Sequence, residues 1–308
     1  MKVLFVASSN KGFINPTVMF QGDAIKKEGV SVVYFGIAGK GYLGYLSNIV
    51  PLKKIIKKEK PDVIHAHYAF CGVVTGFASP GIPIVVSLMG SDTKLGLLRR
   101  VLFILLPSLM WDTIIVKSSS MKKVLGLGKA LVVPNGVDLE EVKPHVTEDS
   151  GSGSKVVLFG SDPERPSKNF LLANKAYSIV KEKINDSYLK IVFGKPHHEL
   201  IKEINSAKVL LVTSLWEGSP NIVKESMACN CPVVSTDVGD VKWLFGDEPG
   251  YYLTTYDPMD VANKITSALK YSDKYGKTNG RQRIINLGLD STAIARKILE
   301  VYRKVLES

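Results

Sequence analysis

The sequence has few cysteines and no long apolar segment. Three cysteines among 308 residues are too few for a disulfide framework, which indicates a reducing compartment. The longest apolar stretch, residues 101–111, contains Pro107 and Ser108, whereas a membrane span needs about twenty residues. The apolar run at residues 3–7 is too short for the core of a signal peptide. We therefore expect a cytoplasmic protein, either soluble or peripheral on the inner face of the membrane.

Acidic residues are outnumbered, 29 against 40 Lys and Arg, which gives a net charge of +11. Residues 1–150 carry +7 and residues 151–308 carry +4. A hydrophobic content of 45% excludes global disorder. No helix-turn-helix pattern, zinc-ligand spacing or aromatic RNA-binding signature accompanies the charge, so we expect no nucleic acid partner. The positive excess suits phosphate-bearing substrates or anionic lipid.

Short apolar runs alternate with helical patterns along the whole chain. Strands separated by helices imply parallel pairing with right-handed crossovers. We therefore expect an α/β fold of two Rossmann-like doubly wound domains. Expected strands are 3–7, 30–35, 62–65, 82–88, 114–116, 130–133, 155–160, 189–193, 209–213 and 232–235. Expected helices are 16–28, 43–58 with a break near Pro51, 70–77, 169–183, 199–205 and 220–229, with further helices from there to the end.

The composition changes at residues 148–154, Glu-Asp-Ser-Gly-Ser-Gly-Ser, which is typical of a flexible linker. We therefore expect an N-terminal domain at 1–147 and a C-terminal domain at 152–290. A surface loop inside one domain and an artificially introduced linker are the alternatives.

The most informative segment is 214–228, which follows an apolar strand and opens a helix. Ser219 suits the N-cap and Pro220 the first helical position. Such a helix start attracts phosphate or sugar oxygens, and Gly218 lets a ligand approach the backbone closely. The amides expected to point out of this helix start are those of Asn221 and Ile222.

Glu217 and Glu225 lie eight residues apart in this segment. On a continuous helix this spacing spans about 12 Å, whereas paired glycosidase carboxylates lie about 5–9.5 Å apart. Two separate contacts along one elongated ligand therefore fit better than a glycosidase pair. Two solvated glutamates on a capped helix are the alternative.

The setting Glu-Gly-Ser-Pro-Asn-Ile-Val-Lys-Glu resembles the retaining nucleotide-sugar glycosyltransferases of the GT-B fold, the family-4 type also called glycosyl transferases group 1. The resemblance continues at 228–239 and reappears at 61–68, 89–92 and 133–138. It covers nearly the whole chain in the expected order, and the Glu–Glu segment is its specific part.

The resemblance implies roles around a cleft between two domains. Glu217 would contact hydroxyls of the donor sugar, Glu225 would bind the nucleotide ribose, and backbone groups of 218–222 would hold sugar and phosphate. His67 would line the sugar and acceptor side. The first domain's rim of the cleft would consist of Gly90, Ser91 and Asp92. The C-terminal segment 291–308 would pack back on the first domain.

A second phosphate-binding element is expected at residues 160–169. Lys168 matches the family's lysine, which neutralises the leaving diphosphate. Many relatives have arginine directly after the glycine, where this chain has Ser161, and Arg165 is the expected substitute. Ordinary solvated loop cations are the alternative. Two cations and a helix terminus can replace a magnesium clamp, so we expect neither a metal nor a cofactor.

Several other residues carry weaker signals. The loop that contains Gly12 lacks the dinucleotide-binding fingerprint, and Gly12 is expected to approach the sugar donor closely. His65 is expected to be structural, and His197 and His198 to be a solvated helix cap. Residues 50–60 carry a net +4 and are a candidate face for anionic lipid, with residues 97–103 as a second candidate. A solvated basic face backed by the core is the alternative. The lysines proposed to face the membrane are Lys53, Lys54, Lys57 and Lys58.

We therefore expect an enzyme that transfers a sugar from a UDP- or GDP-sugar to a hydroxyl of a glycan or lipid-linked acceptor, in polysaccharide or glycolipid synthesis. The resemblance implies a retaining, front-face mechanism without a protein nucleophile. The alternatives are an epimerase or phosphorylase of the same architecture, a non-catalytic nucleotide-sugar-binding module, and a two-lobed solute-binding protein.

Overall fold

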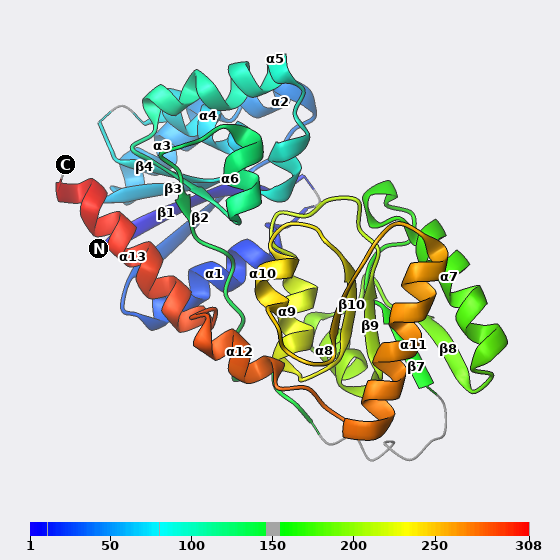
Figure 1. The fold of residues 1–308 in the computed structure, drawn as a ribbon. Helices are drawn as coiled ribbons and strands as arrows, with labels where there is room; N and C mark the ends of the chain where they lie inside the picture. The colour runs from blue at the N-terminus through cyan, green and yellow to red at the C-terminus, as the bar shows by residue number, and fades with distance from the viewer. Residues whose placement is uncertain (11, 80, 146–154, 308) are drawn as a thin grey trace. The chain divides into compact units, whose positions relative to one another are not determined.

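A computed structural model describes residues 1–10, 12–79, 81–145 and 155–307 (Figure 1). The chain forms two compact units. Unit 1 comprises residues 1–136 together with the C-terminal segment from Ser291, and unit 2 comprises residues 137–290. Each unit contains one parallel sheet with helices between its strands, which confirms the predicted α/β architecture. The expected linker at 148–154 lies outside the described residues.

The sheet of unit 1 has the order β2-β1-β3-β4-β5-β6 (Figure 1). The order reverses between β1 and β3, and ligands of such sheets bind beyond the carboxyl ends of the strands at this point. The loop that contains Gly12 follows β1, and His67 ends β3, so both lie at this switch point. The strands are β1 (Lys2–Ser8), β2 (Ser31–Ile37), β3 (Val63–His67), β4 (Ile84–Ser87), β5 (Thr113–Val116) and β6 (Leu131–Val132).

Successive side chains of the unit 1 strands point to opposite faces of the sheet, so the core of unit 1 has a part on each face. Leu4 and Ile64 belong to a core cluster with α3 (Ile49–Glu59), α4 (Ala69–Ala78) and α6 (Ser119–Leu125). The alternate residue Phe5 packs its ring against His65. The C-terminal helix α13 (Ser291–Glu307) packs against α1 (Pro16–Lys27), and its Tyr302 reaches His65. The C-terminal helix therefore completes unit 1.

A break was expected near Pro51 in the helical segment 43–58, and the structure does have two helices, α2 (Gly41–Leu46) and α3, but divides them earlier. The break falls at Ser47 and Asn48, and Pro51 lies in the first turn of α3. A proline is tolerated there because the first amides of a helix have no intrahelical acceptor.

Residues 90–110, which include most of the apolar stretch at 101–111 that was not assigned to an element, form short helical pieces between β4 and β5. These are η1 (Gly90–Lys94), α5 (Leu97–Arg100), a π-helical turn η2 (Val101–Leu105) and η3 (Pro107–Met110). Among the described residues, no helix combines the length and apolar character that crossing a membrane requires.

The sheet of unit 2 has the order β11-β10-β9-β7-β8. The strand β11 (Tyr251–Thr254) was missed by the prediction, which had only helices after residue 235. The other strands are β7 (Lys155–Phe159), β8 (Ser187–Ile191), β9 (Val209–Val212) and β10 (Val233–Thr236). The helices are α7 (Phe170–Lys183), α8 (His197–Ser206), α9 (Asn221–Ala228), α10 (Val241–Phe245), α11 (Pro258–Tyr275) and α12 (Gly280–Asn286).

Residues 137–145 belong to unit 2, although the sequence suggested a domain boundary at 147. The amide of Val137 donates to the carbonyl of Leu289 at 2.9 Å. The guanidinium of Arg281 donates to the carbonyls of Leu139 and Val142 at 2.6 and 2.7 Å. These bonds tie the segment after Gly136 to α12 and to the residues that follow it, so the division between units comes before the linker-like composition.

Candidate functional site

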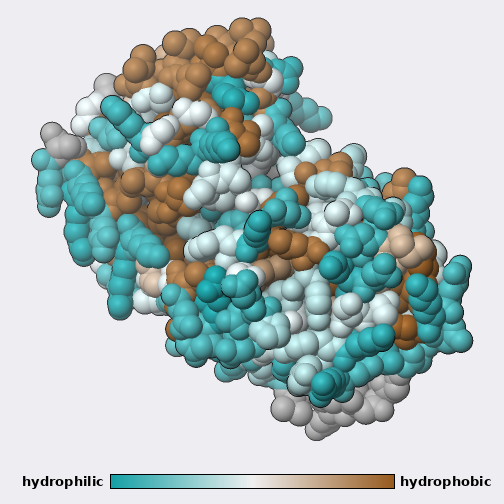
Figure 2. All heavy atoms as spheres, in the orientation of Figure 1, coloured by the Kyte–Doolittle hydropathy of each residue, from teal (hydrophilic) through white to brown (hydrophobic). Residues whose placement is uncertain are grey.

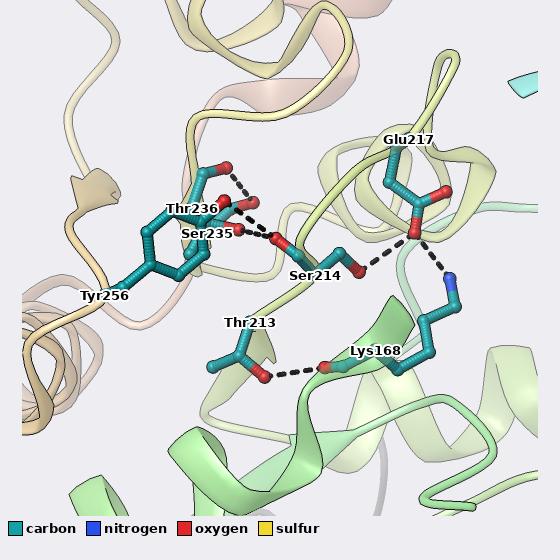
Figure 3. Close-up of polar contacts among 7 residues, drawn as sticks. All are labelled: Lys168, Thr213, Ser214, Glu217, Ser235, Thr236 and Tyr256. Atoms are coloured by element: carbon teal, nitrogen blue, oxygen red, sulfur yellow. Dashed lines mark hydrogen bonds and ion pairs between the residues drawn. The ribbon is translucent and has the colours of Figure 1, made fainter. Parts of the chain in front are cut away.

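Glu217 lies in the loop between β9 and α9, where it contacts a lysine from a distant part of the chain. Its Oε1 atom accepts hydrogen bonds from Lys168 Nζ at 2.5 Å and from Ser214 Oγ at 2.9 Å (Figure 3). The two charged side chains are 16% and 19% exposed. The structure therefore brings together the two residues to which the sequence assigned the donor sugar and the leaving diphosphate.

The loops that carry this pair are joined through their backbones. Thr213 Oγ1 donates to the carbonyl of Lys168 at 3.0 Å (Figure 3). The amide of Leu215 donates to the carbonyl of Ser167 at 2.9 Å. Because each bond links the 160–169 loop to the segment that follows β9, the position of Lys168 depends on that of Glu217.

The end of β10 supports the same loop from another direction. Thr236 Oγ1 donates to the carbonyl of Ser214 at 2.7 Å (Figure 3). Gly239 has a φ of +64°, and a Cβ added there would lie 2.8 Å from the carbonyl oxygen of Gly218. Gly239 therefore permits a close approach of backbone to backbone beneath the Glu217 turn.

The helix α9 begins at Asn221, with Pro220 as its N-cap, one residue later than predicted. Ser219 is therefore not the helix cap that the sequence indicated. Its Oγ instead accepts a hydrogen bond from Lys224 Nζ at 3.1 Å. The hydroxyl thus ties the loop to the first turns of the helix rather than capping it.

Lys224 is fully buried and is not among the site residues predicted from the sequence. Burial lowers the pKa of its ammonium to about 8, while the nearby Asp240 favours the charged form. Burial also raises the pKa of Asp240, against the opposing effects of Lys224 and the Ser219 hydroxyl. A buried polar cluster therefore lies under the Gly218–Pro220 turn. No local sequence pattern predicts this cluster, because Lys224 lies in an amphipathic helix and Asp240 comes from the loop after β10.

The other predicted residues of the phosphate loop differ in their surroundings, since Gly160 is packed against α9 and Arg165 is exposed. Gly160 directly follows β7, and a Cβ there would overlap Cδ1 of Ile222, so the loop packs directly on the start of α9. Arg165 is exposed three residues before Lys168, and its amide donates to the carbonyl of Asp162 at 3.3 Å. Of the two predicted cations, Lys168 contacts Glu217, and the role of Arg165 stays a prediction.

Glu225 pairs with His197, which was expected to be part of a solvated helix cap. Glu225 Oε1 lies 3.1 Å from His197 Nε2, and the Glu225 side chain is 14% exposed. The hydrogen bond to Glu225 raises the pKa of His197. The solvated-cap expectation for His197 was therefore wrong. The position of His197 in the sequence could have indicated this pair, because α8 and α9 both begin after parallel strands, whose carboxyl ends share one edge of the sheet. Glu217 and Glu225 have different partners, which suits two separate ligand contacts.

In unit 1, His67 ends β3 and is 2% exposed. Both of its ring nitrogens are buried without a hydrogen-bond partner among the described residues, and its ring stacks on His65 at 4.3 Å. His65 itself contacts Tyr302 Oη through Nδ1 at 2.5 Å and Ser87 Oγ through Nε2 at 2.8 Å. Burial lowers the pKa of both histidines. His65 is thus held as a structural residue, whereas His67 keeps unused hydrogen-bonding capacity.

Asp92 was expected on the rim of a cleft, and its carboxylate is turned inward instead. It is 1% exposed and accepts hydrogen bonds from the amides of Met89 at 2.7 Å and Ala69 at 3.4 Å. Burial raises its pKa to about 7. Ser91 is exposed. Tyr68, which precedes Ala69, has a φ of +93°, a strained conformation of the kind that clusters at functional sites.

Gly12 is exposed in the loop after β1, with a φ of +84° and open space around the position of a Cβ. Among residues 1–10, 12–79, 81–145 and 155–307, no group of three His, Cys, Asp or Glu could hold a metal ion. The expectation that no metal or cofactor is needed stays a prediction.

Both halves of the chain match known glycosyltransferase families. Residues 12–141 match Glycosyltransferase Family 4, and residues 127–271 match Glycosyl transferases group 1. An uncharacterised glycosyltransferase of Methanocaldococcus jannaschii is 28% identical over 260 residues, which are 77% of this chain and 74% of that protein. The UDP-Gal:alpha-D-GlcNAc-diphosphoundecaprenol alpha-1,3-galactosyltransferase of Escherichia coli is 24% identical, covering 83% of this chain and 79% of that protein.

Among solved structures, Anabaena HepE in complex with UDP-glucose has a TM-score of 0.78 at 16% identity. The match covers 99% of this chain and 100% of that one. This likeness supports the GT-B fold. The two family matches and the sequence relatives identify the chain as a member of the family-4 glycosyltransferases, glycosyl transferases group 1.

Proposed function

We propose that the protein transfers a glycosyl unit, with retention of configuration, from a UDP- or GDP-sugar to a hydroxyl of a lipid-linked acceptor. The observation that carries the proposal is the Lys168–Glu217 contact at the start of α9. It sets a cation and a carboxylate side by side at the end of a parallel sheet, where phosphate and sugar groups bind.

In this proposal, charge on the departing diphosphate accumulates beside Lys168 and the first turn of α9. A preorganised cation and a helix N-terminus stabilise such charge in the transition state. Glu217 accepts hydrogen bonds from hydroxyls of the donor sugar, and Glu225, held by His197, accepts them from the ribose. The diphosphate takes the proton of the acceptor hydroxyl on the same face of the sugar, so no protein nucleophile is needed.

Unit 1 is proposed to bind the acceptor at the carboxyl ends of β1 and β3. Two features support this: His67 has ring nitrogens without a described partner, and the adjoining Tyr68 has a strained backbone. The E. coli relative is named for a diphosphoundecaprenol acceptor and a UDP-sugar donor. A polyprenyl-diphosphate sugar is therefore the first acceptor to test. Metal-independent transfer is part of the proposal, with Lys168 and α9 in the place of a metal.

The test begins with a thermal-shift panel of UDP-, GDP- and ADP-sugars. The donor with the largest shift is then incubated with undecaprenyl-diphosphate sugars in EDTA, and the anomeric configuration of the product is read by NMR. Retention is expected. Inversion, or conversion of the nucleotide sugar without an acceptor as an epimerase would give, would refute the proposal.

Glu217→Gln keeps the shape of the side chain and removes its charge, so transfer should fall while the fold persists. The matched control is Glu199→Gln, which alters a partly exposed glutamate of the same unit that pairs with Lys195. Wild-type transfer by a folded Glu217→Gln protein would contradict the proposed site.

A further inference from the structure

Unit 1 exposes a row of leucines on the helical pieces between β4 and β5. Leu97, Leu98 and Leu109 are 75%, 72% and 86% exposed. Figure 2 shows apolar side chains gathered over the segment that Figure 1 labels α5. The leucine surface, as we call it, consists of Leu97, Leu98, Leu102, Leu105, Leu106 and Leu109.

The other side of this segment is packed into the core. Ile104 and Pro107 are buried. Phe103 stacks on Tyr42 of α2 at 4.9 Å and lies 4.3 Å from the ring of Phe70. A surface helix of a globular protein normally has a polar outer face. The buried side and the exposed side of this segment both carry apolar residues. Because its buried side chains are packed into the core, its exposed leucines have a defined position on the surface of unit 1.

The charge around the leucine surface has one sign. Residues 93–111 contain three basic and no acidic residues, and residues 38–58, which include α2 and most of α3, contain five lysines and no acidic residue. Lys53, Lys54, Lys57 and Lys58 are all exposed on α3, which packs on α4 as η2 does.

The whole positive excess of the protein belongs to unit 1. Unit 1 has 21 basic and 8 acidic residues, a net +13, whereas unit 2 has 19 and 21, a net −2. A leucine surface whose own segment carries only basic charges, on a unit of this charge, complements a bilayer that contains anionic lipid.

We propose that the leucine surface and the α3 lysines dock unit 1 on the surface of an anionic lipid bilayer. The leucines enter the headgroup region, and the lysines contact anionic headgroups. A second copy of the chain is disfavoured as the occupant, because pairing this face would bring two units of +13 together. The proposal deepens the proposed function, since a lipid-linked acceptor is presented at such a surface.

Sedimentation with vesicles tests the apolar part of the proposal. Wild type should pellet with vesicles of phosphatidylcholine and phosphatidylglycerol at low salt. The double variant Leu98→Glu, Leu109→Glu should bind at least about tenfold more weakly, because two carboxylates replace apolar groups that enter the lipid. The matched control is Leu171→Glu, Leu306→Glu, which alters two leucines that are exposed elsewhere. Equal binding by both double variants would overturn the proposal.

The charged part has its own matched pair of variants. Changing all four α3 lysines to glutamine should weaken binding by at least about tenfold, since each lysine near an anionic surface contributes about fivefold. The control changes four exposed lysines of unit 2 to glutamine and alters the net charge equally. These lysines are Lys175, Lys202, Lys242 and Lys270. Equal losses in the two variants, or equal binding of wild type to pure phosphatidylcholine vesicles, would refute the assignment.

Failure of this inference is separable from failure of the proposed function. Vesicle binding needs no sugar donor, and transfer to a detergent-dissolved acceptor needs no bilayer. The leucine and lysine variants should therefore keep wild-type transfer in detergent and the wild-type circular dichroism spectrum. Analytical ultracentrifugation adds the remaining outcome: a wild-type dimer that the Leu98→Glu, Leu109→Glu variant converts to a monomer would show that a second copy covers this face and would overturn the proposal.

Discussion

Replacing Lys168 by methionine removes a charge from the site while keeping most of the length of the side chain. In the wild type, Glu217 Oε1 accepts hydrogen bonds from Lys168 at 2.5 Å and from Ser214 at 2.9 Å. The variant keeps the second bond. A hydrogen bond to a charged group contributes about 1.5–3 kcal/mol, and the remaining bond together with solvent recovers part of it. We therefore expect a loss of about 1–2 kcal/mol in the free energy of unfolding.

This loss is too small to abolish activity through unfolding. Domains are stable by about 5–15 kcal/mol, so even the lower figure reduced by 2 kcal/mol leaves more than about 99% of the protein folded. The thermal midpoint should fall by about 2–8 °C. Transfer should fall by about 10²–10³-fold, because one preorganised group that stabilises the developing charge is gone.

The assays are calorimetric binding of UDP or GDP and single-turnover transfer with the donor found by thermal shift. The control is Lys195→Met, because Lys195 pairs with Glu199 at 3.1 Å in the same unit and is 54% exposed. It should change neither stability by more than about 1 kcal/mol nor transfer. A Lys168→Met protein that binds the nucleotide and transfers sugar within about threefold of wild type would refute the assignment of Lys168 to the diphosphate.

Two further predictions concern the support of the site. Gly239→Ala brings a methyl group against the Gly218 carbonyl and should weaken nucleotide binding by about tenfold in calorimetry. The control is Gly194→Ala, because Gly194 has a similar φ of +69° but open space around it, and this variant should bind the nucleotide normally. Equal effects of the two variants would contradict the steric argument. The bond to Glu225 raises the pKa of His197, so the protonated imidazole stabilises the fold fully below about pH 6.5 and this stabilisation is lost as the pH rises through the raised pKa. The difference in thermal midpoint between wild type and His197→Asn should therefore be largest near pH ~5.5 and shrink above the raised pKa; a difference that stays constant with pH would count against the pair.

Two strands that the sequence predicted well, β9 and β10, are buried on both faces. They are bounded by polar or proline residues and consist, apart from Ser235, of apolar and β-branched residues, so a local pattern is enough to locate them. β8 and β11 lie at the edges of the unit 2 sheet. β8 was predicted two residues too late, because its half-exposed side chains give no clear inner face. β11 was missed because its two central residues are only partly buried, so it lacks the continuous apolar run of an inner strand.

The sequence predicted which residues belong to the site better than it predicted the contacts between them. The motif named Glu217 and Lys168, but their contact arises from two loops that are 49 residues apart. The His197–Glu225 pair and the burial of Lys224 depend on which loops meet at the end of the sheet. The inward turn of Asp92 likewise depends on amides that lie outside its own motif. Such contacts follow from the packing of the sheet and leave no periodic trace in the sequence.

The backbone bonds between the two loops of unit 2 bear on the entropy of ligand binding. Thr213 and Leu215 fix the 160–169 loop to the segment that carries Glu217 before any ligand arrives. Ordering a flexible loop on binding reduces affinity, because the lost conformational freedom opposes association. Here that freedom is already lost when unit 2 folds, so a ligand that contacts both loops meets one surface rather than two independent segments.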